Sequence, residues 1–183
     1  MPTENELKYV LQRQFAYDLK NGKVDLHGGE LRPPKSFQQA YLYGDTVMSV
    51  RVRGVNHCAF SMTVKQKIPT RVVEIETDIS QEDFKDLWEA SSERLCKDRY
   101  DYFVVRDGRS YKWEIDLFYD SDGTCYFVQA EHEMLENQAY PDFIPDLIQE
   151  YLLWAVPQAD SGDFSSRKLS DVGYASYMYD QLK

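Results

Sequence analysis

Residues 3–12 read TENELKYVLQ, and three charged side chains in this stretch, Glu4, Glu6 and Lys8, occupy every second position. Successive side chains of an extended strand point to opposite faces, so these three charges would share one face of a strand. A single strand of this kind is compatible with an ordinary solvent-exposed face. The repetition of the pattern elsewhere in the chain therefore decides the fold.

The same alternation recurs in five further stretches. Each places two like charges on one strand face, where they repel each other unless a group of opposite charge lies between them. These pairs are Arg51 and Arg53, Glu74 and Glu76, Lys97 and Arg99, Glu114 and Asp116, and Glu131 and Glu133, with Lys65 in the same phase as Ser61 and Thr63. Any one pair alone is more typical of a solvated strand face, but the repetition favours a shared charged interior.

Turn signals separate these stretches into short antiparallel strands. Residues 38–67 contain strand-like runs with turns near YGD and GVNH, and residues 71–79 form another run. Residues 96–135 contain three runs separated by turns at RDGR and SDG. Because short turns join antiparallel neighbours, the sequence predicts a large antiparallel sheet.

Two amphipathic helices are expected beside the sheet. The first spans residues 80–95 and begins with Ser80 and Asp83, which resemble a capping box; the second lies within residues 141–154. The Gly- and Pro-rich residues 22–34 are typical of a loop. The apolar helix sides are formed by Phe84, Leu87, Trp88 and Leu95, and by Phe143, Ile144, Leu147, Ile148, Tyr151 and Leu152.

Closure of the strands into a barrel would place the charged faces inside. Closure removes sheet edges, and the apolar outer faces, which include Trp113, Ile115 and Leu117, would need helices over them. A charged interior is costly when it is dry and unpaired, so we expect it to be wet or filled by a ligand. The 183 residues fit one domain, 1–183, of the α+β class.

The chemistry of the two charge types identifies the class of ligand. Arg and Lys side chains suit phosphate oxygens, and Arg binds them through two parallel donors. Clustered carboxylates suit hard divalent cations such as Mg²⁺ or Mn²⁺, which bind oxygen and bridge readily to phosphates. The combination predicts a metal-bound chain of phosphates, a small-molecule partner.

The composition of the chain predicts which other partners it lacks and in which cell compartment it resides. The net charge of −10 disfavours a broad basic surface for nucleic acid. The three cysteines have neither paired nor CxxC spacing, so a reducing cytoplasm is expected. No signal peptide is evident, and no apolar run approaches the roughly 20 residues that span a bilayer, so we expect no membrane partner.

Six motifs of the chain resemble, in the same order, those of the CYTH domain proteins, also called triphosphate tunnel metalloenzymes. The motifs are ENELK, VRVR, TVK, CKDRY, WEIDLF and QAEHE. ENELK fits their ExExK signature. The resemblance implies an eight-stranded antiparallel β-barrel that forms a triphosphate tunnel with covering helices. The chain is most similar to the small bacterial inorganic triphosphatases, which implies metal-dependent hydrolysis of inorganic triphosphate or a related compound. A homodimer is left open.

The resemblance also implies roles for individual residues. The expected phosphate-binding residues are Lys8, Arg51, Arg53, Lys65, Lys97 and Arg99, with Arg167 as a contact at the end of the tunnel. The expected ligands of Mg²⁺ or Mn²⁺ are Glu4, Glu6, Asp116, Glu131 and Glu133, together with Glu74 and Glu114. Glu6 and Lys97 are the expected catalytic residues, and Lys97 is a candidate proton acceptor if cationic neighbours depress its pKa.

Two features leave alternatives open. The family usually has Glu-x-Glu after the lysine strand, but Val72 stands here in place of the first Glu and Glu74 in place of the second. Whether Val72 or Glu76 faces the tunnel is not decided by the sequence. The alternative functions are an adenylyl cyclase of the same fold, which converts ATP to cyclic AMP, and a non-catalytic sensor that binds a polyphosphate or nucleotide.

Overall fold

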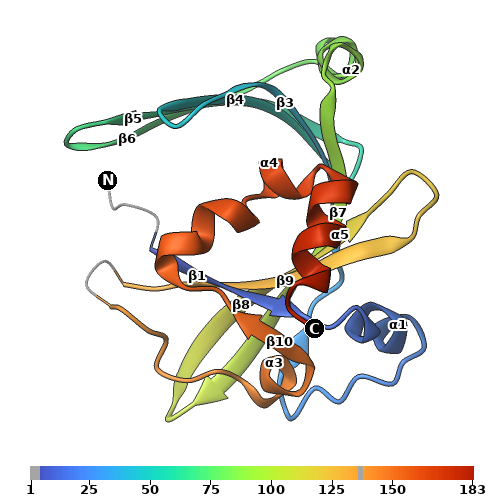
Figure 1. Ribbon diagram of the computed structural model, residues 1–183, viewed down its shortest axis with the longest axis vertical. Helices are drawn as coiled ribbons and strands as arrows, with labels where there is room; N and C mark the ends of the chain where they lie inside the picture. The colour runs from blue at the N-terminus through green and yellow to red at the C-terminus, as the bar shows by residue number, and fades with distance from the viewer. Residues whose placement is uncertain (1–4, 136–137) are drawn as a thin grey trace.

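The computed structural model describes residues 5–135 and 138–183, which one antiparallel sheet organises (Figure 1). The strands are β1 (Glu6–Leu11), β2 (Glu30–Leu31), β3 (Lys35–Gly44), β4 (Met48–Val55), β5 (Ala59–Ile68), β6 (Arg71–Asp78), β7 (Glu93–Arg106), β8 (Arg109–Tyr119), β9 (Cys125–Glu133) and β10 (Leu152–Ala155). The helices are α1 (Gln14–Lys20), α2 (Gln81–Ala90), α3 (Asp146–Tyr151), the 3₁₀ helix η1 (Gln158–Phe164), α4 (Ser166–Leu169) and α5 (Val172–Asp180).

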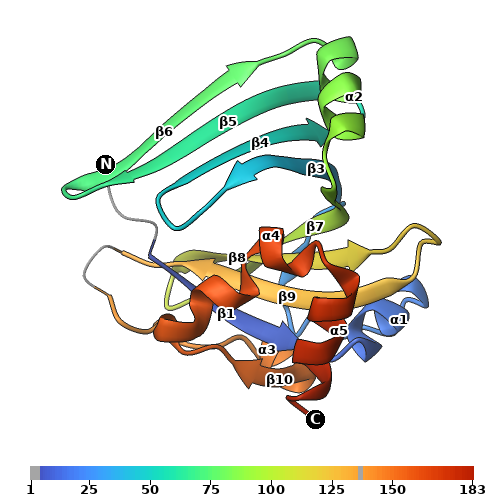
Figure 2. The same ribbon diagram turned by 45° about the horizontal axis from the view of Figure 1, so that its top comes forward.

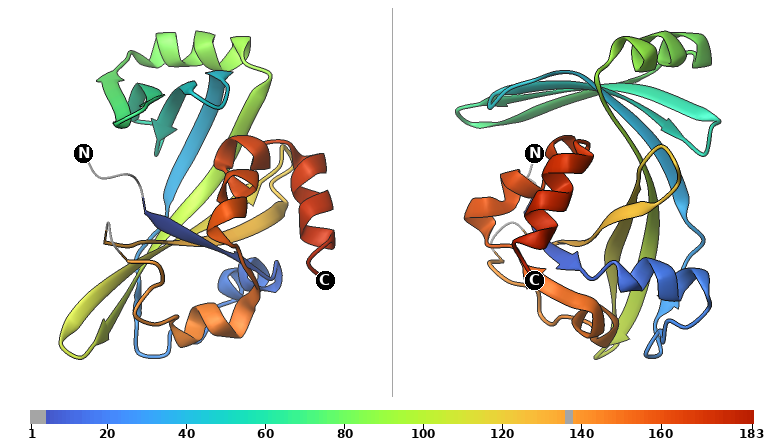
Figure 3. Two further views of the ribbon diagram at one scale, coloured as in Figure 1. Left: turned by 60° about the vertical axis from the view of Figure 1, so that its left-hand side comes forward. Right: turned by 45° about the vertical axis from the view of Figure 1, so that its right-hand side comes forward.

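The strand order is β10-β1-β9-β8-β7-β3-β4-β5-β6, with β2 paired to β7, and every pair is antiparallel. The α+β fold class is confirmed. The sheet has ten strands instead of eight, because two short strands are added, and no pairing joins β6 to β10 within the described chain. The sheet is therefore bent but not closed. The segment η1–α4–α5 lies between its two halves (Figures 2 and 3).

The turn residues explain why the chain reverses where the sequence predicts. The β7–β8 hairpin pairs Arg106 with Arg109, so only Asp107 and Gly108 form its turn, with φ of +51° and +74°. Asp and Gly are among the residues that tolerate this left-handed region, which a two-residue hairpin turn requires. The predicted turn at RDGR is therefore confirmed.

Helix α2 confirms the first expected helix at its beginning but not at its end. The Asp83 N–H donates to Ser80 Oγ at 3.0 Å, which satisfies one free donor of the first turn. The helix ends at Ala90, and the prediction that Leu95 belongs to it is wrong, since Leu95 is buried in β7. Ser91 has extended backbone angles, and its hydroxyl donates to the Tyr41 carbonyl oxygen at 2.8 Å.

The second expected helix is also shorter than predicted. Pro145 is extended and immediately precedes α3, while Leu152 is extended and begins β10, which pairs with β1. The apolar residues outside Asp146–Tyr151 therefore belong to a loop and a strand. Helices α1, α4 and α5 and the 3₁₀ helix η1 were not predicted from the sequence. No helix within the described residues is both long and apolar enough to cross a bilayer.

Helices cover the apolar outer face of the sheet, as the sequence predicts. One buried cluster contains Trp113, Ile115 and Leu117 of β8 together with Phe15 of α1 and Leu147 of α3. Helix α2 instead covers β3, β4 and β5 at the other end of the sheet, where Phe84 packs against Ala40 and Val52 (Figure 1). These helices thereby bury the apolar side chains of the outer face that lie beneath them, which leaves the inner face for polar chemistry.

The inner face is divided between an apolar part and a charged part. Phe118 of β8 and Phe127 of β9 form a buried cluster with Phe164 of η1, Leu169 of α4 and Tyr179 of α5. The C-terminal helices thus cover one end of the concave face. The charged side chains occupy the remainder of that face.

Candidate functional site

A cavity of about 1240 Å³ lies on the concave face of the sheet. It is lined by all of the side chains expected to bind phosphate, namely Lys8, Arg51, Arg53, Lys65, Lys97, Arg99 and Arg167. It is also lined by five expected metal ligands, namely Glu6, Glu74, Glu114, Glu131 and Glu133. Asp116 is fully buried against Lys97 and Arg99, and Glu4 lies outside the described residues.

The strand order separates most of the acids from most of the bases. The adjacent strands β1, β9 and β8 carry carboxylates in register, so that Glu6 pairs with Glu133 and Glu131 with Glu114. On the other side, β4, β5 and β7 carry most of the cations. Because β7 lies beside β8, Arg99 pairs with Asp116 at the boundary. The cavity therefore has an acidic wall and a basic wall.

Arg99 connects three carboxylates. It donates to both oxygens of Asp116 at 2.6 Å and to Glu131 Oε2 at 3.0 Å, and it also contacts Glu114. Burial alone would lower the pKa of this guanidinium, but the carboxylates of Asp116, Glu131 and Glu114 outweigh burial and raise it. Arg99 is thus the main counterion of the acidic wall.

Lys97 lies beside Arg99 and is almost completely buried. Its Nζ is 2.5 Å from Asp116 Oδ2 and 3.3 Å from Ser166 Oγ. Burial lowers the pKa of Lys97; Asp116 opposes this shift, and the charge of Arg99 adds to it. Burial raises the pKa of Asp116, but Lys97 and Arg99 outweigh it and bring the pKa to about 2. The two cations therefore keep Asp116 ionised.

Lys8 and Glu131 meet on the acidic wall. Lys8 Nζ is 3.2 Å from Glu6 Oε1 and 4.0 Å from Glu131 Oε1, and Gln129 Nε2 donates to Glu131 Oε1 at 2.8 Å. Burial raises the pKa of Glu131, and the negative charges of Asp116 and Glu6 raise it further. The carboxylates of Glu6, Asp116 and Glu131 thus lie close enough together to repel one another.

The basic wall brings positive charges close together. Arg53 Nε donates to Gln39 Oε1 at 2.8 Å, and the pKa of Arg53 is lowered to about 10 by burial and by the positive charges of Arg51 and Arg99. Arg51 Nε is buried and has no hydrogen-bond partner among the described residues. Nearby like charges disfavour the charged form, so an anion placed here would relieve their repulsion.

Strand β6 decides the question of Val72 and Glu76. Both lie on the same face of β6 as Glu74. Val72 lines the cavity together with Glu74, whereas Glu76 is not among the described residues that line it. Lys65 pairs with Glu74 at 3.4 Å. Glu76 accepts a hydrogen bond from the Thr63 hydroxyl at 3.0 Å. Val72 therefore contributes an apolar surface at the position where the resemblance expects a carboxylate.

Arg167 reaches the cavity from α4. Its Nε and Nη2 donate to the two oxygens of Glu93 at 2.7 and 3.1 Å, and its Nη1 donates to the Gly44 carbonyl oxygen at 2.7 Å. A Cβ at Gly44 would lie 2.4 Å from Arg167 Nη1. The absence of a side chain at Gly44 is therefore what allows Arg167 to pack against β3.

We expect Gly44→Ala to displace Arg167 and to weaken the binding of inorganic triphosphate several-fold, because one guanidinium leaves the cavity wall. Isothermal titration with inorganic triphosphate measures the change. The matched control is Gly173→Ala in α5, outside the cavity, whose added methyl group meets only Asp171 Oδ1, at 3.2 Å. Equal affinities of the Gly44→Ala variant and the parent would contradict a role for Arg167 in binding.

The acidic wall fits a hard divalent cation in the chemistry of its donors. Glu114, Asp116 and Glu131 all present carboxylate oxygens to the single guanidinium of Arg99. Among the described residues, however, no three metal-ligating side chains are arranged to hold an ion. A cation bound here would have to share or replace Arg99 as the partner of these carboxylates.

Comparison with known proteins shows the fold. No family model matches the sequence, and no curated protein matches it. The solved structure of the hypothetical protein NE1496 is 24% identical with a TM-score of 0.58, and the match covers 92% of this chain and 97% of that chain. The chain is similar to NE1496 in fold. At this level of identity the similarity extends to the fold alone.

Two further solved structures are more distant. The PH1012 protein from Pyrococcus horikoshii OT3 is 16% identical with a TM-score of 0.46, and the match covers 72% of this chain and 79% of that one. HpAC1 from Hippeastrum, described as having a dominant triphosphatase activity, is 16% identical with a TM-score of 0.38, over 73% and 80% of the two chains. Both TM-scores are too low to support an argument.

Several residues of the site were missed from the sequence. Gln39 and Tyr41 are buried beside Arg53, and their alternation with apolar residues in FQQAYLY was the signal that could have identified them. Gln129 is in phase with Glu131 in the same way. Ser166 carries no such signal, because a distant segment brings it to Lys97.

Asp45 lies at the β3–β4 turn and also lines the cavity. The Tyr43 hydroxyl donates to it at 2.6 Å, and the N–H groups of Val47 and Met48 donate to its other oxygen at 2.7 Å. These hydrogen bonds, that of Tyr43 first, lower the pKa of Asp45 to about 2 from an ordinary value of 3.8. The turn is therefore built around an ionised carboxylate.

We expect Tyr43→Phe to raise the pKa of Asp45 toward its ordinary value, because the largest cause of the shift is removed. A lowered pKa in the folded protein means that the ionised carboxylate stabilises the turn above about pH 4 and that this contribution is lost as the pH falls through about 2. A carboxyl-carbon NMR titration measures the midpoint. Tyr177→Phe, at an exposed tyrosine, is the control, and an unchanged midpoint in Tyr43→Phe contradicts the assignment.

Proposed function

We propose that the protein is a metal-dependent triphosphatase of the CYTH type that hydrolyses inorganic triphosphate or a related triphosphate compound. The observation that carries this proposal is the cavity of about 1240 Å³, in which a basic wall faces an acidic wall. A polyphosphate needs cations along its oxygens, and a divalent ion bound to it needs carboxylates. One cavity provides both types of group.

The basic wall supports binding of a chain of phosphates rather than of a single anion. Arg51 and Arg53 extend from β4, Lys65 from β5, and Lys97 and Arg99 from β7, so the cations are distributed over three strands, with β3 between β4 and β7. Burial lowers the pKa of Arg53, and the positive charges of Arg51 and Arg99 lower it further, so an anion beside these side chains would relieve their repulsion. The protein as a whole has a net charge of −10, so the attraction for a polyanion is confined to this cavity.

We assign the divalent ion, Mg²⁺ or Mn²⁺, to the acidic wall. Its proposed ligands are Glu4, Glu6, Asp116, Glu131 and Glu133, with Glu114 beside them; Glu74, the remaining expected ligand, lies on β6, where it pairs with Lys65 of β5. When bound, such an ion lowers the pKa of a coordinated water and neutralises phosphate charge. The close approach of carboxylates on β1, β8 and β9 supports a cation at this wall.

The residues of the chain have separate tasks in this proposal. Lys97 and Arg99 stabilise the charge on the phosphoryl group that is transferred, because their ion pairs with Asp116 hold them as preorganised donors. Lys8 extends the phosphate contacts across to the acidic wall, where Glu6 holds it at 3.2 Å. Glu6 would thus hold the metal ion while it also positions the phosphate-binding Lys8.

The test is phosphate release from inorganic triphosphate, thiamine triphosphate, ATP and GTP, each with Mg²⁺, with Mn²⁺ and with a chelator. We expect metal-dependent turnover of inorganic triphosphate that falls about 100-fold or more in Lys8→Ala and in Glu6→Gln. Lys20→Ala, at an exposed cation on α1, is the control. Cyclic AMP formed from ATP would indicate a cyclase instead, and tight binding without turnover would indicate a sensor.

A further inference from the structure

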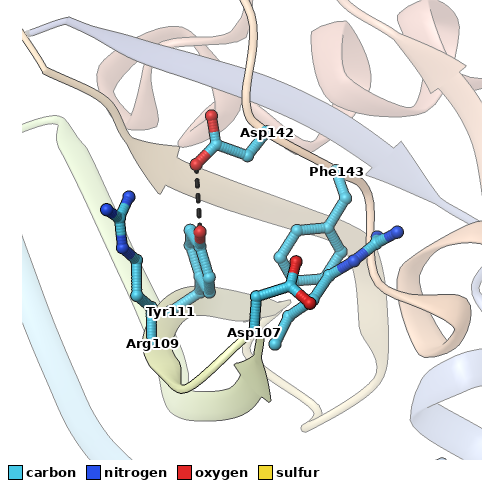
Figure 4. Close-up of a pocket in the computed structure, with 6 residues that line it drawn as sticks. Asp107, Arg109, Tyr111, Asp142 and Phe143 are labelled. Atoms are coloured by element: carbon cyan, nitrogen blue, oxygen red, sulfur yellow. Dashed lines mark hydrogen bonds between the residues drawn. The ribbon is translucent and has the colours of Figure 1, made fainter.

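A second, smaller pocket lies at the β7–β8 hairpin. Its volume is about 420 Å³, within the range of about 300 to 1,000 Å³ that is common for small-molecule sites. The hairpin contributes one side and the loop before α3 contributes the other (Figure 4). The lining residues are Arg106, Asp107, Arg109, Tyr111, Asp142 and Phe143.

This pocket adjoins the charged cavity. Arg109, Tyr111 and Asp142 line both spaces, so a ligand whose phosphates lie in the large cavity can extend past these three side chains. The Tyr111 hydroxyl donates to Asp142 Oδ2 at 3.0 Å across the boundary (Figure 4). The small pocket is thus placed to receive the part of a substrate that follows the phosphate chain.

The pocket combines aromatic rings with a balanced set of donors and acceptors. The rings of Tyr111 and Phe143 meet edge to face at 5.0 Å, and the guanidinium of Arg106 lies 4.7 Å from the Phe143 centroid. Planar heterocycles stack on such rings and on guanidinium planes. The two arginines supply donors and Asp107 supplies an acceptor, while the two oxygens of Asp142 accept from Tyr111 and Gln138.

This balance distinguishes the pocket from a site for one more phosphate. A phosphate has only acceptor oxygens and a negative charge, so Asp107 and Asp142 would repel it. A heterocycle with acceptors on one edge and donors on another satisfies both kinds of side chain; guanine, for example, can accept from Arg and donate to a carboxylate. The two charge types in the pocket therefore favour a neutral polar ring over an anion.

We propose that this hairpin pocket binds the heteroaromatic ring of a nucleoside triphosphate, with a purine as the best match, while the triphosphate lies in the charged cavity. The proposal rests on the proposed function, since it assigns an organic group to the same substrate. It makes Phe143 and Asp107 determinants of specificity that act on the ring and not on the phosphates.

The test compares GTP with inorganic triphosphate in Phe143→Leu and Asp107→Asn. Leu keeps an apolar side chain but lacks a ring face, and Asn tolerates the positive φ of residue 107, so neither change should prevent folding. We expect kcat/KM for GTP to fall about tenfold in Phe143→Leu, as loss of a stacked ring would cause, with kcat/KM for inorganic triphosphate unchanged. Asp107→Asn should shift the ratio in the same direction.

Val105→Ala, at an exposed residue of the same hairpin outside the pocket, should leave both substrates unaffected. Isothermal titration with a GTP analogue that has a methylene bridge between its last two phosphates gives a second readout without turnover. Equal losses for GTP and inorganic triphosphate, or no loss for either in both variants, overturn the ring site. If no triphosphate is hydrolysed, the proposed function fails, yet the analogue titration still tests whether the pocket binds the ring.

Discussion

We expect the Arg99→Ala variant to unfold with a free energy about 3 to 5 kcal/mol lower than that of the parent protein, the range measured when one partner of a buried ion pair is removed. Arg99 is the shared partner of Glu114, Asp116 and Glu131. The side chain of Asp116 is only 1% exposed, so water cannot take the place of the lost guanidinium beside it. Without the guanidinium, Lys97 alone must compensate Asp116. Urea denaturation at pH 7, followed by tryptophan fluorescence, measures the loss.

The matched control is Lys183→Ala, which removes a cation 3.0 Å from Asp180 in a pair whose side chains are both more than half exposed. Exposed pairs contribute about 0 to 1 kcal/mol, so this variant should remain close to the parent. If Arg99→Ala lost no more free energy of unfolding than Lys183→Ala, water or protons would already neutralise the acidic wall. The site would then lack the charge that a divalent cation requires.

The direction of each charged side chain could be predicted from the sequence, but the partner of each charge could not. Alternation alone places Lys97 with Arg99, and Glu114 with Asp116, on one face of a strand, and the structure places them there. The pairing of Arg99 with Glu131 depends on the order of β7, β8 and β9 and on their register. A one-residue slip of register would have exchanged the two faces.

The limits of the helices were less predictable, because contacts distant in sequence fix them. The apolar spacing that continues to Leu95 is compatible with a helix, yet Ser91 turns the chain by hydrogen bonding to Tyr41, fifty residues earlier. Similarly, Ser166 and Arg167 meet the cavity only because the C-terminal helices pack on Phe118 and other inner-face residues. No local pattern records such contacts.

The second large effect is expected for Lys97→Met, which replaces a buried ammonium by an apolar side chain of similar length. We expect the rate of inorganic triphosphate hydrolysis to fall about 100- to 1,000-fold, the range for loss of one preorganised donor to a transition state. The fold should suffer less than in Arg99→Ala, since Asp116 keeps both of its hydrogen bonds to Arg99. Steady-state kinetics and urea denaturation of the same preparation separate the two effects.

Lys97→Arg and Ser166→Ala refine this result. Lys97→Arg keeps the positive charge but changes its shape, so recovery of most of the activity would assign Lys97 an electrostatic task, whereas no recovery would indicate a need for the compact ammonium. Ser166→Ala removes the 3.3 Å contact to Nζ together with the hydrogen bond between Ser166 and Tyr41, and should lower kcat modestly with little change in KM. If Lys97→Met retained full turnover while binding triphosphate normally, Lys97 would be a structural counterion of Asp116, and the chemistry would have to be assigned to Arg99 and the acidic wall.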